Sequence, residues 1–220
     1  MARKTKSGSA DTQHLYFFRS QTSWESDSFF LSKPDYWVFG DEQGFAYLVN
    51  SLRTQLRAKK TLDLERVPFT TSNSQPVLIL PAQDSPVKPR IRLVERCAFR
   101  GSQFVMELIL AGNRSGFEKL AQIVESLVAT PFDERAFSEH LHVNDWTDRW
   151  VVRESVSLNI RAPVSRWSDK MARENHSFLF DPDHLNLPEE CGYLTPETCP
   201  YEPPDVADAA FKLTDSARWS

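Results

Sequence analysis

Two segments of the chain share one pattern of glycine, polar and apolar positions. Residues 40–48 and residues 112–120 both read Gly-[Asp/Asn]-x-x-Gly-Phe-x-x-Leu, and corresponding positions differ by 72. Apolar runs at 36–39 and 105–110 precede the two segments. Four of the seven glycines of the chain lie in these segments, so a chance match is a poor explanation. The pattern therefore predicts an internal duplication.

Each copy of the pattern predicts a strand followed by a capped helix. Asp41 and Asn113 stand where a side-chain oxygen accepts a hydrogen bond from the first helical turn. Gly44 and Gly116 fall inside that turn, where a missing side chain lets the helix approach the strand that it left. Apolar residues then follow at spacings of three and four, which is typical of a helix with one buried face: Phe45, Leu48, Val49, Leu52 and Leu56, and Phe117, Leu120, Ala121, Val124 and Val128.

Further strands are predicted after each helix, at 76–80 and 90–99 in the first copy and at 140–143 and 151–160 in the second. Their alternation of apolar and polar residues is typical of half-buried antiparallel strands. Each copy thus reads strand–helix–strand–strand. The predicted fold class is α+β, a tandem duplication with antiparallel sheet, helices packed on one face and a pseudo-twofold axis.

The composition divides the chain into four parts. Residues 1–13 form a polar, basic tail that we expect to be disordered. The first repeat is predicted at 14–100 and the second at 101–167. Residues 168–220 are a proline-rich, acidic C-terminal arm, which either covers an exposed sheet edge or serves as a binding element.

Charge and hydropathy narrow the functional class. The 220 residues carry a net charge of −4 with a pI near 5.8, which disfavours a general nucleic-acid binder. No apolar run is long enough to span a membrane, and the basic start lacks the apolar segment of a signal peptide, so we expect a cytoplasmic protein. Residues 1–110 hold 15 Lys/Arg and 11 Asp/Glu, and residues 111–220 hold 11 and 19. The acidic second half either reflects composition drift or faces a basic protein partner.

The segment 139–150 carries the side chains best suited to chemistry. His140 and His142 share one side of a predicted strand, and Asp145 and Asp148 could add oxygen ligands. A metal-dependent hydrolase using His140, His142 and Asp145 is therefore one hypothesis. Against it, the pattern His-x-His-x-Asp-His is absent, and residues 78–80 of the first copy hold no histidine. Because no nucleophile elbow or phosphate-binding loop occurs either, the sequence predicts no catalytic residue, no metal and no cofactor.

The same segment also suits recognition of another protein. Trp146 and Trp150 stand in a polar turn beside carboxylates, where we expect exposed aromatic side chains to act as anchors. Packing of both rings in the core is the alternative. The predicted partner-binding residues are His140, His142, Asp145, Trp146, Asp148 and Trp150.

Residues 40–45 with Leu48 and Leu52, and residues 140–143 after the second helix, resemble bacterial polymorphic-toxin immunity proteins, in particular the immunity protein 32 family. The resemblance covers about residues 36–162 as two diverged copies. Phe45 and Phe117 stand where that family has an aliphatic residue, and the arm after 165 has no counterpart. The resemblance implies a cytoplasmic, non-enzymatic protein that binds and neutralises a toxin domain, and the acidic second half favours a basic toxin domain as the partner. A structural subunit of a larger complex is a further hypothesis, and the oligomeric state is open.

Overall fold

The computed structural model describes residues 15–20, 35–64, 75–84, 88–100, 103–129, 140–144, 148–153 and 155–161. The predicted tail at 1–13 and the predicted arm at 168–220 lie outside these residues. Within them, no helix is both long and apolar enough to cross a membrane.

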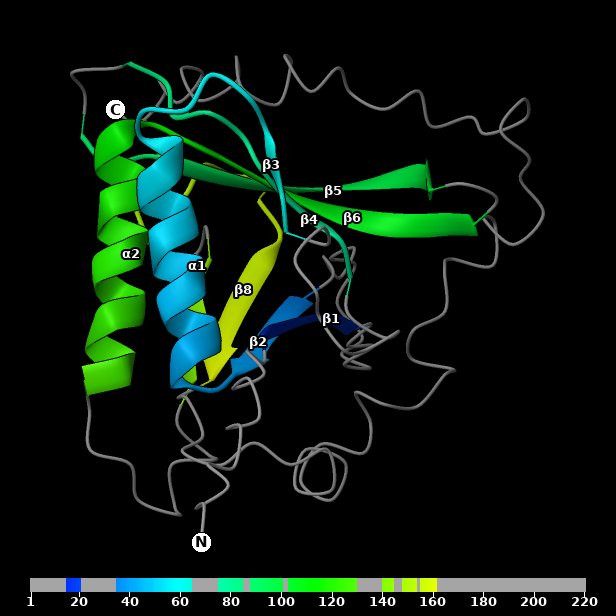
Figure 1. Ribbon diagram of the computed structural model, residues 1–220, viewed down its shortest axis with the longest axis horizontal. Helices are drawn as coiled ribbons and strands as arrows, with labels where there is room; N and C mark the ends of the chain where they lie inside the picture. Colours follow the sequence, from blue (N-terminus) through cyan, green and yellow to red (C-terminus); the bar gives the residue numbers. More distant parts are fainter. Residues whose placement is uncertain are drawn as a thin grey trace, which may run out of the picture.

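Two helices and eight strands make up the described fold, which is α+β as predicted. In chain order the elements are β1 (Leu15–Ser20), β2 (Asp35–Gly40), α1 (Glu42–Gln55), β3 (Leu62–Asp63), β4 (Val77–Ile79), β5 (Ile91–Arg100), β6 (Gln103–Gly112), α2 (Arg114–Ala129), β7 (His140–Val143) and β8 (Ser157–Arg161). The helices stand side by side on one side of the molecule and run in opposite directions, and the β5–β6 hairpin extends away from them (Figure 1).

The strands form two four-stranded sheets, and each sheet takes strands from both halves of the chain. Sheet I has the order β1-β2-β8-β7, and sheet II has the order β3-β4-β6-β5. In both sheets the two outer pairs are antiparallel, while the central pair, β2–β8 or β4–β6, is parallel. Each sheet therefore combines one antiparallel strand pair from the first half of the chain with one from the second half.

Two details of the prediction need correction, and a third concerns the boundary between the repeats, which stays a prediction. The sheet is not a single antiparallel one but two mixed sheets, because alternation along a strand reports which face is buried and not the direction of the neighbouring strand. The repeating unit is strand–strand–helix–strand–strand, since β1 precedes β2 as β5 precedes β6. The strand at 91–99, placed in the first repeat, pairs along its whole length with β6 of the second.

The strand registers of the two halves correspond. Leu15 lies opposite Gly40, and Ile91 lies opposite Gly112. Two residues before those glycines, Val38 lies opposite Ile160 and Leu110 lies opposite Ile79. Whether this likeness arose by duplication stays a prediction. Replacing each strand of sheet I (β1-β2-β8-β7) by its counterpart gives β5-β6-β4-β3, which is the strand order of sheet II and the relation that an approximate twofold axis between the halves produces.

One hydrophobic core joins the inner faces of both sheets to the buried faces of both helices. All the predicted helix residues belong to it or pack against it; Phe45, Leu52, Phe117 and Val124 are fully buried. Two smaller clusters lie on the outer faces, one in sheet I around Tyr16, Phe18 and Phe39 and one in sheet II around Leu78, Leu80, Ile109 and Ala111.

The predicted helix caps are confirmed. The amide of Gly44 donates to Asp41 Oδ1 at 2.7 Å, and the amide of Gly116 donates to Asn113 Oδ1 at 2.8 Å. Asn113 does more than Asp41, because its Oδ1 also accepts from the Arg90 amide at 2.9 Å and its Nδ2 donates to the Lys88 carbonyl at 3.0 Å. The cap of α2 thereby fixes the chain just before β5.

Close backbone approach explains Gly116. A Cβ atom there would overlap the backbone of Arg90, including its carbonyl oxygen. The sequence predicted an approach to the strand that the helix leaves, which is β6. The contact instead is with the residue that leads into β5, because the Asn113 cap holds that residue against the helix start.

Candidate protein-binding edge

The two predicted histidines lie on β7, an edge strand of sheet I. Val143 is buried in the core and Leu141 packs against it, so His142, between them on the strand, faces the outer side of the sheet. His142 is exposed and lies opposite Asn159 of β8, while His140 lies opposite Arg161. The side chain of His140 lies outside the described part of the chain, so the placement of both histidines on one side of the strand stays a prediction.

The outer side of sheet I also carries a half-buried arginine. The guanidinium of Arg161 lies 4.8 Å from the centre of the Trp37 ring. Burial lowers the pKa of Arg161 below its ordinary value, because desolvation penalises the charged form. Asn159, next to both, is buried, and its Oδ1 has no hydrogen-bond partner in the described part of the chain.

The predicted anchor Trp150 is not exposed. Only 6% of its surface is accessible, and it belongs to the core. Its Nε1 donates to Asp148 Oδ1 at 3.1 Å, and Lys119 Nζ lies 4.7 Å from the ring centre. The polarity of the surrounding turn had suggested exposure, but a turn does not determine where an indole points. Trp150 therefore closes the core, as in the packing alternative.

Asp148 stabilises the turn. Its Oδ2 accepts from the Asn144 amide at 3.3 Å, and its own amide donates to the Asn144 carbonyl at 3.2 Å. Asp145 and Trp146 lie outside the described residues, so a metal site that includes Asp145 stays a hypothesis. Among the described residues, no group of three or more His, Cys, Asp or Glu side chains could hold a metal ion.

The segment that contains Trp150 covers part of the edge of sheet II. The Ile91 amide donates to the Trp150 carbonyl at 3.0 Å, and the Val152 amide donates to the Ile91 carbonyl at 2.8 Å. Further along, the Val156 amide donates to the Leu93 carbonyl at 3.0 Å, and the Leu93 amide donates to Ser155 Oγ at 3.3 Å. The described residues of the range 150–156, which leave out 154, thus occupy the edge of β5 at Ile91 and Leu93.

Beyond Leu93 the edge of β5 continues without a neighbour among the described residues. Ile91 and Leu93 direct their backbone groups away from β6, and the β5–β6 register is uninterrupted to Arg100. Every second residue of a strand presents its N–H and C=O to the same side. Glu95, Cys97 and Phe99 therefore present theirs to the open side, and we call this stretch, residues 95–99, the open edge.

The inner side of the open edge begins with a buried ion pair between the sheets. Arg19 of β1 donates to Glu95 through Nε at 2.5 Å and Nη2 at 3.1 Å. The Tyr36 hydroxyl donates to the same carboxylate at 2.8 Å. The side chains of Arg19 and Glu95 are 8% and 13% exposed, so the pair joins sheet I to sheet II in a largely dry environment.

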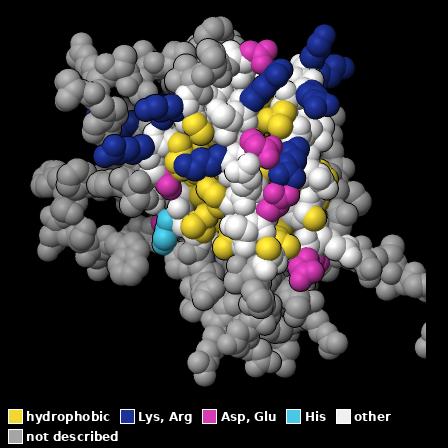
Figure 2. Space-filling model, turned by 90° about the vertical axis from the view of Figure 1, so that its left-hand side faces the viewer, with side chains coloured by type: hydrophobic (Ala, Val, Ile, Leu, Met, Phe, Trp, Pro, Cys, Tyr) yellow, Lys and Arg dark blue, Asp and Glu magenta, His cyan; other side chains and the backbone are white. Residues whose placement is uncertain are grey.

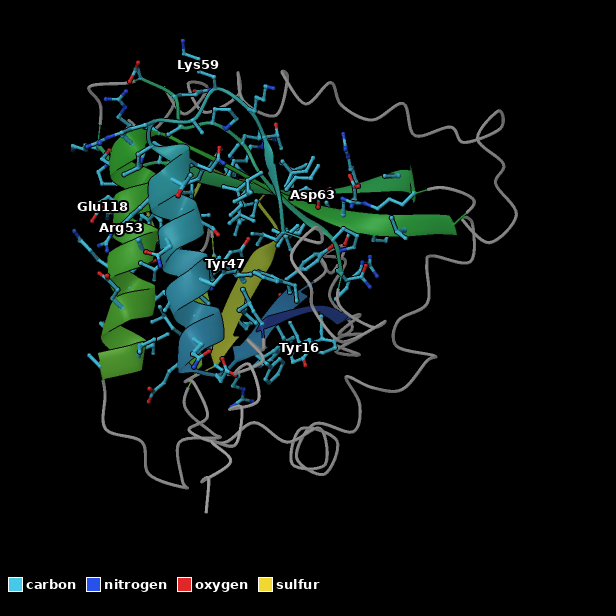
Figure 3. The ribbon with its side chains drawn as sticks, in the orientation of Figure 1. Tyr16, Tyr47, Arg53, Lys59, Asp63 and Glu118 are labelled. Atoms are coloured by element: carbon cyan, nitrogen blue, oxygen red, sulfur yellow. The ribbon has the colours of Figure 1, made fainter. Side chains whose placement is uncertain are left out.

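The outer side of β5 carries arginine at every fourth position. Arg96 Nε donates to Glu107 at 2.6 Å, and Arg100 donates to Glu107 at 2.8 Å and to Asp63 at 3.0 Å; Figure 3 marks Asp63 at the end of β3. Desolvation alone would lower the pKa of Arg100, but the bonds to Glu107 and Asp63 outweigh it and raise the pKa. Arg92 forms no ion pair with any described residue, and its buried Nε has no hydrogen-bond partner among them.

A second ion-pair group joins the helices. Arg53 of α1 donates to Glu118 at 3.0 Å and to Glu125 at 2.6 and 2.8 Å, and Figure 3 shows Arg53 beside Glu118. The bonds to Glu125 and then Glu118 raise the pKa of Arg53 above its ordinary value. The face seen from the helix side mixes both signs of charge with apolar side chains (Figure 2), so it offers no single-sign surface for a charged partner.

The sequence did not lead us to predict the open edge, the ion pairs between the two helices or the ion pair between the two sheets. One signal was present, since Arg92, Arg96 and Arg100 fall on the same side of the strand at 91–100. Basic side chains in such a row are typical of an edge strand. The ion pairs gave no signal, because their partners are 65 to 76 residues apart in the chain.

Comparison of the chain with protein-family models, with curated proteins and with solved structures finds no significant match in any of the three.

Proposed function

We propose that this protein is a non-enzymatic protein-binding module, and that it acts in the cytoplasm as an immunity or accessory protein that binds and neutralises a toxin domain. The observation that carries the binding part is the open edge of β5. An unpaired strand edge is a ready template for a second chain. The immunity part rests on the resemblance of residues 40–45 and 140–143 to the immunity protein 32 family.

The fold supports a binding role in a second way. The open edge lies on a long hairpin that is fixed at its base by the Arg19–Glu95 pair and by residues 150–156. A strand that is already paired on one side loses less conformational freedom on binding than an unstructured segment does, so more of the interaction energy appears as affinity.

The test is protection of cells against the toxin domain encoded beside this chain. Co-expression should restore growth, and the purified proteins should form a 1:1 complex with a Kd of about 10 nM or tighter, in the range of other standard-size protein complexes. Lys59→Ala, in the exposed turn that follows α1 (Figure 3), serves as a matched surface control that should protect as well as the natural chain. If the adjacent gene encodes no toxin domain, or if growth is not restored, the immunity function is wrong.

A further inference from the structure

We propose that the open edge of β5 binds an extended segment of the partner protein by strand addition, and that this segment presents an acidic side chain to Arg92 and Arg96. The inference rests on the proposed function in that it names how the protein binds its partner. It is carried by the backbone of β5, the charges on its outer side and the path of residues 150–156.

The first argument is the set of unused backbone groups. Residues 95–99 offer three N–H and three C=O groups to one side, at Glu95, Cys97 and Phe99, with no partner among the described residues. An added strand of five to seven residues would bond all six. Such main-chain bonding gives affinity, and the alternating side chains of the added strand give specificity.

The second argument is continuity with the segment that already lies on this edge. Residues 150–156 follow β5 in the parallel direction, as the bridge between Ile91 and Val151 shows. At Ser157 the chain enters β8, which belongs to sheet I. Among the described residues the covered stretch therefore ends opposite Leu93, and the next edge-facing residue, Glu95, is the first one without a neighbour there.

The third argument is charge. Among the described residues, Arg96 and Arg100 on the outer side bond to two carboxylates, Glu107 and Asp63, whereas Arg92 bonds to neither of these two. Opposite charges on neighbouring strands stabilise pairing and like charges destabilise it. A strand with a carboxylate beside Arg92 and Arg96 would compensate the excess positive charge.

The same charges disfavour a second copy of this chain as the occupant. Antiparallel pairing of two copies over residues 95–99 puts Arg96 of one copy opposite or diagonal to an arginine of the other in every register. Such repulsion is a recognised way in which edge strands avoid pairing with themselves. The arginine row thus blocks self-association and admits an acidic strand.

The test uses the full chain and a capped peptide, Val-Glu-Val-Glu-Val-Glu-Val, followed by amide hydrogen exchange in NMR spectra. In the free protein, the amides of Glu95, Cys97 and Phe99 should exchange at least tenfold faster than those of Ile91 and Leu93. Saturating peptide should slow the first three at least tenfold. A peptide with lysine in place of glutamate, and one with N-methyl groups on its edge-facing amides, should leave them unchanged.

Two variants locate the binding on the protein. Cys97→Pro removes the central donor at a position where an edge strand tolerates proline, and it should weaken peptide binding at least tenfold relative to Cys97→Ala, which keeps the N–H. Arg92→Glu should abolish the preference for the glutamate peptide over the lysine peptide. Because Arg92→Glu leaves every backbone group in place, it remains informative if Cys97→Pro does not fold.

Several results would overturn the inference. One is slow exchange of the amides of residues 95, 97 and 99 in the free protein. Slow exchange that does not depend on protein concentration would mean that another part of this chain occupies the edge. Slow exchange that increases in extent with protein concentration would mean that a second copy occupies it. A second is that the glutamate peptide slows amide exchange only at residues outside 95–99. A third is that the lysine peptide binds as tightly as the glutamate peptide, and a fourth is that Cys97→Pro and Cys97→Ala bind the glutamate peptide equally well. If the protein protects cells against the toxin but one of these results is obtained, the proposed function is retained and only binding by strand addition is wrong.

Discussion

The two halves of the molecule share a plan and differ at three places. Both have a hairpin, a capped helix and a second pair of strands, with matching registers. They differ in the charge of residues near the twofold axis, in the cap, and in the length of the first hairpin. β1 and β2 have six residues each, whereas β5 and β6 have ten. The shared features build the fold, and the differences mark where the second half has structure that the first half lacks.

Counterpart residues meet near the axis in both ion-pair groups. Arg19 and Glu95 are each four residues after the start of β1 and β5, and Arg53 and Glu125 are each 13 residues after the glycine that ends β2 and β6. In a symmetric dimer of two identical halves, a residue at one of these positions would lie against the same residue of the other half, and two like charges would repel each other. One chain can place arginine in one half and glutamate in the other, which favours pairing of unlike halves.

Loss of the buried axis pair should have the largest effect on stability. Glu95→Leu leaves Arg19 buried without its carboxylate, and we expect the free energy of unfolding to fall by about 3–5 kcal/mol. The double variant Arg19→Met with Glu95→Leu removes both charges and should recover most of that loss. Urea unfolding of the three proteins measures it. A double variant no more stable than Glu95→Leu would show that the packing of these side chains matters more than the charges.

Gly116→Val should have the second-largest effect on stability. The new side chain would overlap the Arg90 backbone, and we expect a loss of roughly 1–3 kcal/mol through overpacking. Valine at the exposed helix position Ala46 is the matched control and should cost only the small difference in helix propensity. Equal urea midpoints for Gly116→Val and Ala46→Val would contradict the packing role of this glycine.

The two caps should differ by a smaller amount. Asp41→Ala should cost about 1 kcal/mol, as is usual for a lost cap, and Asn113→Ala should cost up to about 2 kcal/mol, since Asn113 also bonds Arg90 and Lys88. Asn113→Asp keeps the acceptors and loses the donor, so it should lie between Asn113→Ala and the natural chain. Equal losses at Asp41 and Asn113 would mean that the extra bonds do not contribute.

Loss of the exposed ion pairs of Arg53 with Glu118 and Glu125 should have the smallest effect on stability. Arg53, Glu118 and Glu125 are each more than a third exposed, and such pairs contribute little in water. Arg53→Ala should therefore shift the urea midpoint less than either cap variant does. Arg53→Glu gathers three carboxylates and should lower the midpoint further, with part of the loss recovered in 1 M salt because salt screens repulsion. A loss that salt does not change would point to packing instead.

Much of the fold could be predicted from the sequence, because it rests on local signals. The glycines, the caps and the spacing of Phe45, Leu48 and Leu52 all act within one helical turn or two. Sheet membership could not be predicted in the same way. Which strand lies beside β2 depends on contacts between Val38 and Ile160, more than 100 residues apart, and several strands carry the same alternation.

The candidate site shows the same division. The alternation of β7 indicated a strand with one apolar side, and Leu141 and Val143 do contact the core, but the burial of Trp150 depends on β5 and α2, which are distant in sequence. The open edge is a property of the assembled sheet. It exists because residues 150–156 cover β5 only as far as Leu93, and no local pattern in the strand itself shows where its neighbour ends.

The most direct test of the central claim is to make the second hairpin as short as the first. Replacing residues 97–106 by Asn-Gly joins Arg96 to Glu107, which already lie opposite each other, through a two-residue turn suited to that geometry. We expect this variant to unfold cooperatively near the urea midpoint of the natural chain and to lose binding of the acidic peptide and of the toxin domain by at least 100-fold. Unchanged binding by the folded, shortened chain would contradict the claim that the extended β5–β6 hairpin carries the function.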